Sequence, residues 1–253
     1  MPQGGTVHGV SVTAEHLGLK GPRGWAFRGV SLDAGPGALI AVEGPSGSGR
    51  TCLLLALTGR MKATEGTASV GGARLPKQLG AVRRISAVAN VAGVTDLEPA
   101  LTVGEHLRER ALLQSRFGDS LRDLVRRRGA RAAGAGQRVG EALAAAGLDL
   151  QSLPKGARTA VRDLERIEAL RLSVALALVG KPRLLAVDDA DLKLSQDERS
   201  EMRQLLASIA AAGTTVVAVC GQAPPGALVV RTGNTEAAQR EEAGHALATT
   251  GRA

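Results

Sequence analysis

The stretch ALIAVEGPSGSGRTCLLLALTGR, residues 38–60, decides the fold of this 253-residue chain. An apolar segment typical of a buried strand, Ala38–Val42, runs into a glycine-rich loop, Gly44–Gly49, and we expect a helix from Thr51 to Leu57. The phosphate-binding P-loop has the pattern G-x-x-x-x-G-K-[ST] in this strand–loop–helix context. Every position of the pattern is met except that Arg50 stands where lysine is expected. The sequence therefore predicts a phosphate-binding loop.

The chemistry of this loop follows from its residue types. Glycines let successive N–H groups point at one anion, and the helix N-terminus adds the positive end of its dipole. Thr51 offers a hydroxyl to Mg²⁺, and Arg50 keeps the positive charge on a planar guanidinium. We predict that the nucleotide is held by Gly44, Pro45, Ser46, Gly47, Ser48, Gly49, Arg50, Thr51 and Cys52.

A second strand supplies the carboxylate that a P-loop enzyme needs to hold Mg²⁺. The segment RLLAVDDAD contains an apolar strand, Leu184–Val187, which ends at Asp188 and Asp189. We expect Asp188 to lie beside Thr51 in the folded chain.

Strand-like and helix-like segments alternate along the rest of the chain, which favours an α/β fold. A run dominated by Ala, Leu and Arg, Leu101–Lys181, is predicted to be helical with breaks at Gly118–Asp119, Gly147 and Pro154. A further helix is predicted over Gln196–Ala212. The expected strands are Val7–Val12, Trp25–Leu32, Ala38–Glu43, Ala68–Leu75, Ile85–Asn90, Arg183–Asp188, Thr214–Cys220 and Ala227–Arg231.

Composition excludes several classes of protein. Only three aromatic residues are present, so the chain lacks the stacking surface of a single-stranded nucleic-acid binder. Cys52 and Cys220 cannot build a disulfide scaffold or a four-ligand zinc site, and their apolar surroundings predict buried free thiols. The start carries no secretory signal, and the longest apolar stretches are shorter than the ~20 residues of a membrane span. We therefore expect a cytoplasmic protein.

Three segments together resemble the ATP-binding cassette (ABC) family of nucleotide-binding domains. They are GVSLDAGPGALIAVEGPSGSGRT, LEPALTVGEHL and ALVGKPRLLAVDD, and the resemblance covers residues 10–231. It implies an α/β P-loop NTPase core with an N-terminal antiparallel β subdomain and an inserted α-helical subdomain. The core would comprise residues 1–98 and 181–231, the helical subdomain residues 99–180, and a disordered tail residues 232–253.

The resemblance also implies a function. In that family two cassettes sandwich two ATP·Mg²⁺ molecules and drive a membrane-spanning subunit, which would place this chain at the inner face of the cell membrane. Thr51 and Asp188 would hold Mg²⁺, partly through water, and Asn90 takes the place of a glutamine that also reaches the metal. Asp189 takes the place of the glutamate that polarises the attacking water.

Several positions depart from the family pattern. Asp189 is one methylene shorter than glutamate, and an attacking water is sensitive to displacements of about 1 Å. Gly221 falls where the family has a histidine that contacts the γ-phosphate. The adenine-stacking aromatic would fall near Gly21, and Trp25 is displaced from that position.

The family's signature, L-S-G-G-Q, falls on Leu164–Glu168, where Glu165 would set a carboxylate against the partner's phosphate. Helical spacing persists there, and we expect Asp163 to be the N-cap. With both nucleotide-facing surfaces altered, we predict ATP binding with weak hydrolysis. The alternative is a non-hydrolysing regulatory or scaffolding protein; a soluble DNA- or ribosome-associated cassette is disfavoured because there are no coiled-coil arms and no tandem repetition.

An arginine-rich stretch lies inside the helical run. It contains Arg122, Arg126, Arg127, Arg128, Arg131 and Arg138. A solvated helix face is the favoured interpretation, with docking to an anionic membrane leaflet or an acidic partner loop as the alternative. Specific nucleic-acid binding is disfavoured because no helix-turn-helix, zinc or RNA-binding motif accompanies the charge.

Overall fold

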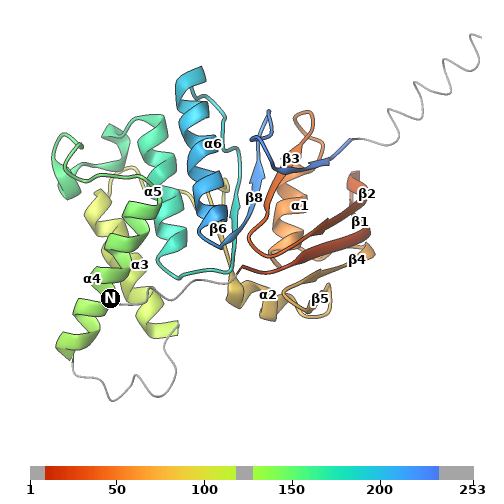
Figure 1. Cartoon of the computed structure of the whole chain (residues 1–253), viewed down its shortest axis with the longest axis horizontal. Helices are drawn as coiled ribbons and strands as arrows, with labels where there is room; N and C mark the ends of the chain where they lie inside the picture. The colour runs from red at the N-terminus through yellow and green to blue at the C-terminus, as the bar shows by residue number, and fades with distance from the viewer. Residues whose placement is uncertain (1–8, 118–127, 234–253) are drawn as a thin grey trace, which may run out of the picture.

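The computed structural model describes residues 9–117 and 128–233 and shows two sheets with helices packed around them (Figure 1). An antiparallel sheet has the order β2-β1-β4-β5 and a parallel sheet the order β6-β7-β8-β3-β9. The antiparallel strands are β1 (Val12–Gly21), β2 (Gly24–Ala34), β4 (Glu65–Val70) and β5 (Ala73–Leu75). The parallel strands are β3 (Leu39–Glu43), β6 (Ser86–Ala89), β7 (Leu184–Val187), β8 (Thr215–Val219) and β9 (Leu228–Arg231). This arrangement confirms the α/β class and the antiparallel sheet that the sequence predicted.

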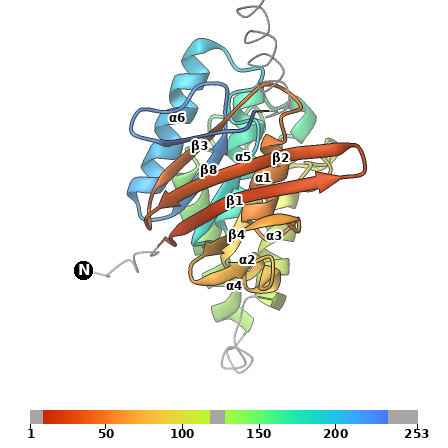
Figure 2. The ribbon, with the colours of Figure 1, turned by 90° about the vertical axis from the view of Figure 1, so that its right-hand side faces the viewer.

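The helices cover both faces of the parallel sheet. Helix α1 (Arg50–Leu57) lies between the two sheets, behind the strands of the antiparallel sheet in Figure 2. The other helices are α2 (Leu79–Ile85), α3 (Val103–Phe117), α4 (Arg128–Ala145), α5 (Arg166–Leu178) and α6 (Gln196–Ala211). Two short 3-10 helices, η2 (Gly156–Arg158) and η3 (Val161–Asp163), precede α5. No helix in the described part of the chain is both long enough and apolar enough to cross a membrane.

Two apolar cores explain why the parallel strands are so hydrophobic. One joins α1 to both sheets, and the other joins the opposite face of the parallel sheet to α3, α5 and α6. Every residue of β6, β7 and β8 is buried, as expected for strands covered on both faces. The carboxyl ends of β3 and β7 therefore meet at one edge of a rigid sheet, where ligands bind in open α/β folds.

Two expectations for the strands were wrong. The first strand does not span Val7–Val12, because the N–H of Val10 bonds to the Thr215 hydroxyl and β1 begins at Val12; residues 7 and 8 lie outside the described part. The expected strand Ala68–Leu75 is instead a hairpin, β4 and β5, which turns at Gly71 and Gly72 with φ of 57° and 83°. That left-handed backbone is open to glycine at little cost.

The two cysteines differ in how far they are exposed. Cys220 is buried as predicted, but Cys52 is partly exposed because it lies in the first turn of α1. Most of the arginine-rich stretch and nearly all of the expected tail, residues 234–253, lie outside the residues whose side chains are described.

Candidate phosphate and metal site

The backbone of the P-loop packs closely against the backbone of two other segments, at Ala26 and at Thr232. It leaves β3, whose residues Ile40–Val42 are fully buried, and wraps over the start of α1. Gly49 adopts φ of 81°, and a Cβ there would lie 2.1 Å from the carbonyl oxygen of Ala26 on β2. Gly44 adopts φ of 154°, and a Cβ there would lie 2.3 Å from the carbonyl oxygen of Thr232. Only glycine fits either position, so these two glycines of the pattern have a steric explanation.

The N-terminus of α1 is open to an anion. The helix begins at Arg50, one residue before the predicted start, and its N-cap is Gly49, which has no side chain to bond the first N–H groups. Its first turn carries no acidic residue. Unsatisfied N–H groups and the positive helix end together form the arrangement that binds phosphate.

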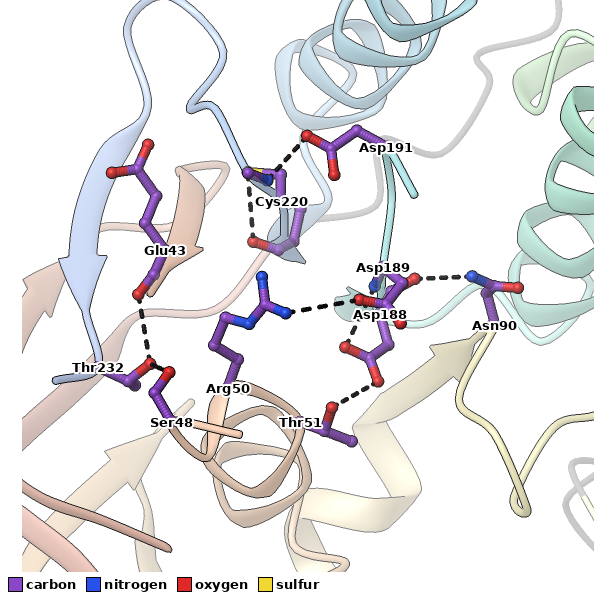
Figure 3. Close-up of polar contacts among 12 residues, drawn as sticks. Glu43, Ser48, Arg50, Thr51, Asn90, Asp188, Asp189, Asp191, Cys220 and Thr232 are labelled. Atoms are coloured by element: carbon purple, nitrogen blue, oxygen red, sulfur yellow. Dashed lines mark hydrogen bonds and ion pairs between the residues drawn. The ribbon is translucent and has the colours of Figure 1, made fainter. Parts of the chain in front are cut away.

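Thr51 and Asp188 meet at the carboxyl ends of β3 and β7, as the sequence predicted (Figure 3). The Thr51 hydroxyl donates to Asp188 Oδ2 at 2.8 Å, and the N–H of Asp189 donates to Asp188 Oδ1 at 3.1 Å. Asp188 is 4% exposed, and this burial raises the pKa of its carboxyl, with the nearby Asp189 adding to the shift. A buried carboxylate facing a hydroxyl suits Mg²⁺, which is typically bound by one or two carboxylates together with substrate phosphates.

Asn90 joins this pair from the end of β6. Its backbone has a φ of 57°, and its N–H donates to the Ser173 hydroxyl on α5 at 2.7 Å. Its side-chain amide donates to the carbonyl oxygen of Asp188 at 2.8 Å, which turns the side chain toward the same carboxyl edge. The structure thus brings Thr51, Asp188 and Asn90 together.

Arg50 and Asp189 face each other across the mouth of this site (Figure 3). Arg50 Nη2 lies 4.0 Å from Asp189 Oδ1, the outer limit of an ion pair, and both side chains are partly exposed. An exposed pair at that distance contributes little to stability. Both side chains therefore remain available to a ligand.

Two neighbours of the site were not found from the sequence. Asp191 Oδ2 accepts from the N–H of Gly221 at 2.8 Å. A backbone amide and a carboxylate therefore occupy the position at which the family pattern has a histidine. Burial and the nearby carboxylates of Asp191 and Glu43 raise the pKa of the Cys220 thiol to about 12, which leaves it unreactive at neutral pH. Thr232, which follows β9, contacts the P-loop through Ser48 at 2.7 Å, and no motif marks it.

Trp25 is engaged by cations of its own sheet. Arg28 lies 4.6 Å and Lys20 5.6 Å from the indole ring, and Arg28 also pairs with Glu65 at 3.0 Å. Gly21, the place for a base-stacking aromatic, presents no side chain. These contacts give Trp25 an intramolecular role on the antiparallel sheet.

The N-terminus of α5 is closed by its own carboxylates. Glu165 is the N-cap, not Asp163 as predicted, because Asp163 ends the 3-10 helix η3. A capping box is formed in which Glu168 accepts from the Glu165 N–H at 2.9 Å and the Glu165 side chain faces the Glu168 N–H. Such reciprocal caps satisfy donors that would otherwise be free for an anion.

A cavity of about 720 Å³ separates this helix end from the Asp188 edge. Arg166, Asn90 and Asp189 line it, and Arg166 Nε donates to the carbonyl oxygen of Leu192 at 3.4 Å.

Comparison with known proteins agrees with this geometry. Residues 27–191 match the sequence profile described as ABC transporter. The chain is 30% identical over 196 residues to the "Cell division ATP-binding protein FtsE" of Streptococcus pneumoniae, covering 76% of each chain. It is 32% identical over 195 residues to the "Fe(3+) ions import ATP-binding protein FbpC" of Streptomyces avermitilis, covering 75% of this chain and 49% of that one.

Among solved structures, the fold matches the "Dimeric Structure of MJ0796, a Bacterial ABC Transporter Cassette" with a TM-score of 0.66 and 22% identity. The match covers 88% of this chain and 95% of that one.

Proposed function

This chain belongs to the ABC transporter family, and we propose that it is an ATP-binding subunit that binds ATP and Mg²⁺, couples to a membrane partner and hydrolyses ATP only slowly. The observation that carries the proposal is the contrast between two helix ends. The N-terminus of α1 is open to a phosphate, whereas that of α5 is closed by Glu165 and Glu168.

Nucleotide binding rests on the loop and the metal edge. Residues Gly44–Cys52 would hold the phosphates, with Arg50 in place of the family's lysine. Thr51 and Asp188 would hold Mg²⁺, partly through water, and the side-chain oxygen of Asn90 would extend the site. The bound metal would offset phosphate charge. The protein would hold the phosphates and the Asp188 carboxylate in fixed positions relative to one another.

Slow hydrolysis rests on both nucleotide-facing surfaces. On the chain's own side, Asp189 is a short candidate base whose backbone φ is 44°, and Gly221 offers only its N–H, which Asp191 already accepts. On the face toward a partner, the carboxylates of Glu165 and Glu168 at the start of α5 would repel a phosphate, so we infer a degenerate signature. Were hydrolysis absent altogether, the same geometry would support a regulatory or scaffolding subunit.

The assembly follows from what the relatives are called. FtsE and FbpC are named as ATP-binding proteins, FbpC for an import system, and the structural neighbour is a dimeric cassette. We propose that this chain dimerises, as a homo- or heterodimer, in the cytoplasm at the inner face of the membrane. Residues 1–98 and 181–231 would form the ATP-binding core and residues 99–180 the helical subdomain.

A positively charged cavity is the best candidate for contact with the membrane partner. This cavity of about 340 Å³ lies between β6, α3 and α5, and among the described residues its charged and titratable lining side chains are Arg60, Arg110, the buried His106 and one carboxylate, Asp96. The two guanidiniums donate to Thr58, Ser86 and Leu176, and neither has a carboxylate within ion-pair distance in the described part of the chain. Burial lowers the pKa of both, and for Arg60 the nearby Arg83 and Arg110 lower it further.

Two partly buried guanidiniums share this cavity with the carboxylate of Asp96, which is not within ion-pair distance of either, so an acidic side chain of a partner would stabilise the remaining positive charge. Replacing both arginines by methionine, which removes the charge but keeps the bulk, should lower the fraction of the chain that sediments with membranes of its host about tenfold. The matched control is the Arg23→Met, Arg74→Met double variant, which removes the same charge from two exposed positions, one in the turn between β1 and β2 and one on β5.

Two outcomes would contradict this docking site. One is a double variant at Arg60 and Arg110 that sediments like the unaltered chain. The other is equal binding of the unaltered chain to protein-free anionic vesicles, because lipid rather than a partner would then account for sedimentation.

The function itself is tested by titrating purified chain with ATP·Mg²⁺ and following phosphate release in the same samples. We expect saturable binding with little turnover.

A further inference from the structure

A buried pair of hydroxyls ties the P-loop to the end of the last strand. The hydroxyl oxygen of Ser48, the residue before Gly49 in the loop, lies 2.7 Å from the hydroxyl oxygen of Thr232, although the two residues are 184 positions apart (Figure 3). Ser48 is 7% exposed and Thr232 is 2% exposed, so water does not compete for this contact. The hydrogen bond is therefore made in a place where losing one partner is expensive.

Thr232 is also bonded to Glu43, the last residue of β3. The backbone N–H of Thr232 donates to the carbonyl oxygen of Glu43 at 2.8 Å, and its hydroxyl reaches the same oxygen at 3.3 Å. The Thr232 hydroxyl is thus within hydrogen-bond distance of both the Glu43 carbonyl oxygen and the Ser48 hydroxyl, and either hydroxyl can donate in the contact between the two side chains. Thr232 is thus bonded to two points of this part of the chain: to Glu43 at the end of β3 and to Ser48 in the P-loop.

The packing around Gly44 shows how closely Thr232 supports the loop. A Cβ on Gly44 would lie 2.6 Å from both hydroxyl oxygens and 2.3 Å from the Thr232 carbonyl oxygen. The start of the loop at Gly44 therefore packs against Thr232, and the hydroxyl pair holds the loop a second time at Ser48. The other side of the loop is held by Gly49 against Ala26.

We propose that Thr232 is a positioning residue for the nucleotide phosphates: its hydroxyl orders the P-loop through Ser48 before any nucleotide binds. An ordered loop has its N–H groups already directed at one point, so binding costs less conformational entropy. Thr232 touches no phosphate itself, and its effect passes through Ser48.

The test uses the full chain and four variants. Thr232→Val removes the hydroxyl at nearly constant volume, Thr232→Ser keeps the hydroxyl, Ser48→Ala removes its partner, and the fourth combines Thr232→Val with Ser48→Ala. Thr159→Val is the matched control, because Thr159 is also a buried threonine, 1% exposed, whose hydroxyl accepts from the Lys155 N–H away from the loop.

Amide hydrogen exchange of residues 47–51, measured without nucleotide, gives the direct readout. We expect Thr232→Val and Ser48→Ala each to accelerate exchange about tenfold, and the combined variant to do no more than either, because the two hydroxyls act as one unit. Thr232→Ser should behave like the unaltered chain. Thr159→Val should lower the unfolding temperature without changing loop exchange.

Nucleotide affinity gives the second readout, and it rests on the proposed function whereas the exchange readout does not. Thr232→Val should raise the Kd for ATP·Mg²⁺ about tenfold, and Thr232→Ser should restore it. A Thr232→Val variant that loses thermal stability but keeps loop exchange unchanged would overturn the positioning role, as would effects of the two single variants that multiply in the combined one. Absence of ATP binding by the unaltered chain would instead defeat the proposed function.

Discussion

Replacing Gly49 by alanine should weaken ATP·Mg²⁺ binding about 100-fold. The added Cβ would lie 2.1 Å from the carbonyl oxygen of Ala26 and 2.5 Å from its carbon, and the φ of 81° disfavours any side chain. Because both neighbours are backbone, relief requires the loop or β2 to move, and a displacement near 1 Å at such a site costs about 100-fold. The measurement is the Kd from calorimetric titration of the purified variant.

Gly72→Ala is the matched control for Gly49→Ala. Gly72 has a φ of 83°, but a Cβ there meets nothing within 4 Å, and it lies in the β4–β5 turn. Gly72→Ala should lower the free energy of unfolding by about 1–2 kcal/mol, the cost of a side chain on left-handed backbone, and leave nucleotide affinity unchanged. If Gly49→Ala bound nucleotide as tightly as Gly72→Ala, the loop described here would not be the phosphate site.

Asp188→Asn should weaken the Mg²⁺-dependent part of nucleotide binding about 10- to 100-fold. The substitution keeps size and the bond from Thr51 but removes the charge that faces the metal. Binding of ATP in the presence of a chelator should be unchanged, which separates metal binding from phosphate binding. Calorimetric titration with and without Mg²⁺ makes this comparison.

Burial of Asp188 adds a pH dependence with a defined sign. Its pKa is raised in the folded protein, chiefly by burial, so the carboxylate takes up a proton at a higher pH than an ordinary aspartate does. Mg²⁺-dependent affinity should therefore be lost as pH falls through this raised pKa. The nucleotide-free protein should gain stability over the same fall, between the folded pKa and the lower unfolded one.

The same burial predicts the stability of the Asp188→Asn variant. Relief of the buried charge offsets the lost bond from the Asp189 N–H, so the unfolding temperature without nucleotide should not fall at neutral pH. A fall in both unfolding temperature and affinity would show that Asp188 is needed for the fold rather than for the metal.

The sequence predicts those parts of the site that local pattern determines. The loop, α1 and the ends of β3 and β7 follow from glycine spacing and apolar runs, and parallel pairing brings Thr51 to Asp188. The contact of Ser48 with Thr232 is not predictable in this way, because it joins hydroxyls 184 residues apart and threonine is ordinary after a strand.

The misplaced cap and strand have physical reasons. Asp163 is a good N-cap residue by type, but the chain turns through a 3-10 helix there, and Glu165 takes the position with help from Glu168. Val10 has the apolar character of a strand residue, yet its N–H and C=O both bond to the Thr215 hydroxyl. In each case a tertiary or neighbouring contact overrides local propensity.

Phosphate release from purified chain saturated with ATP·Mg²⁺ tests the central claim most directly. An open α1 terminus with a closed α5 terminus predicts saturable binding together with turnover at least about 100-fold below the ~1 s⁻¹ lower end of typical enzymes. Turnover within the usual range that Asp188→Asn abolishes would contradict slow hydrolysis. Failure to bind at millimolar ATP·Mg²⁺ would contradict the nucleotide site itself.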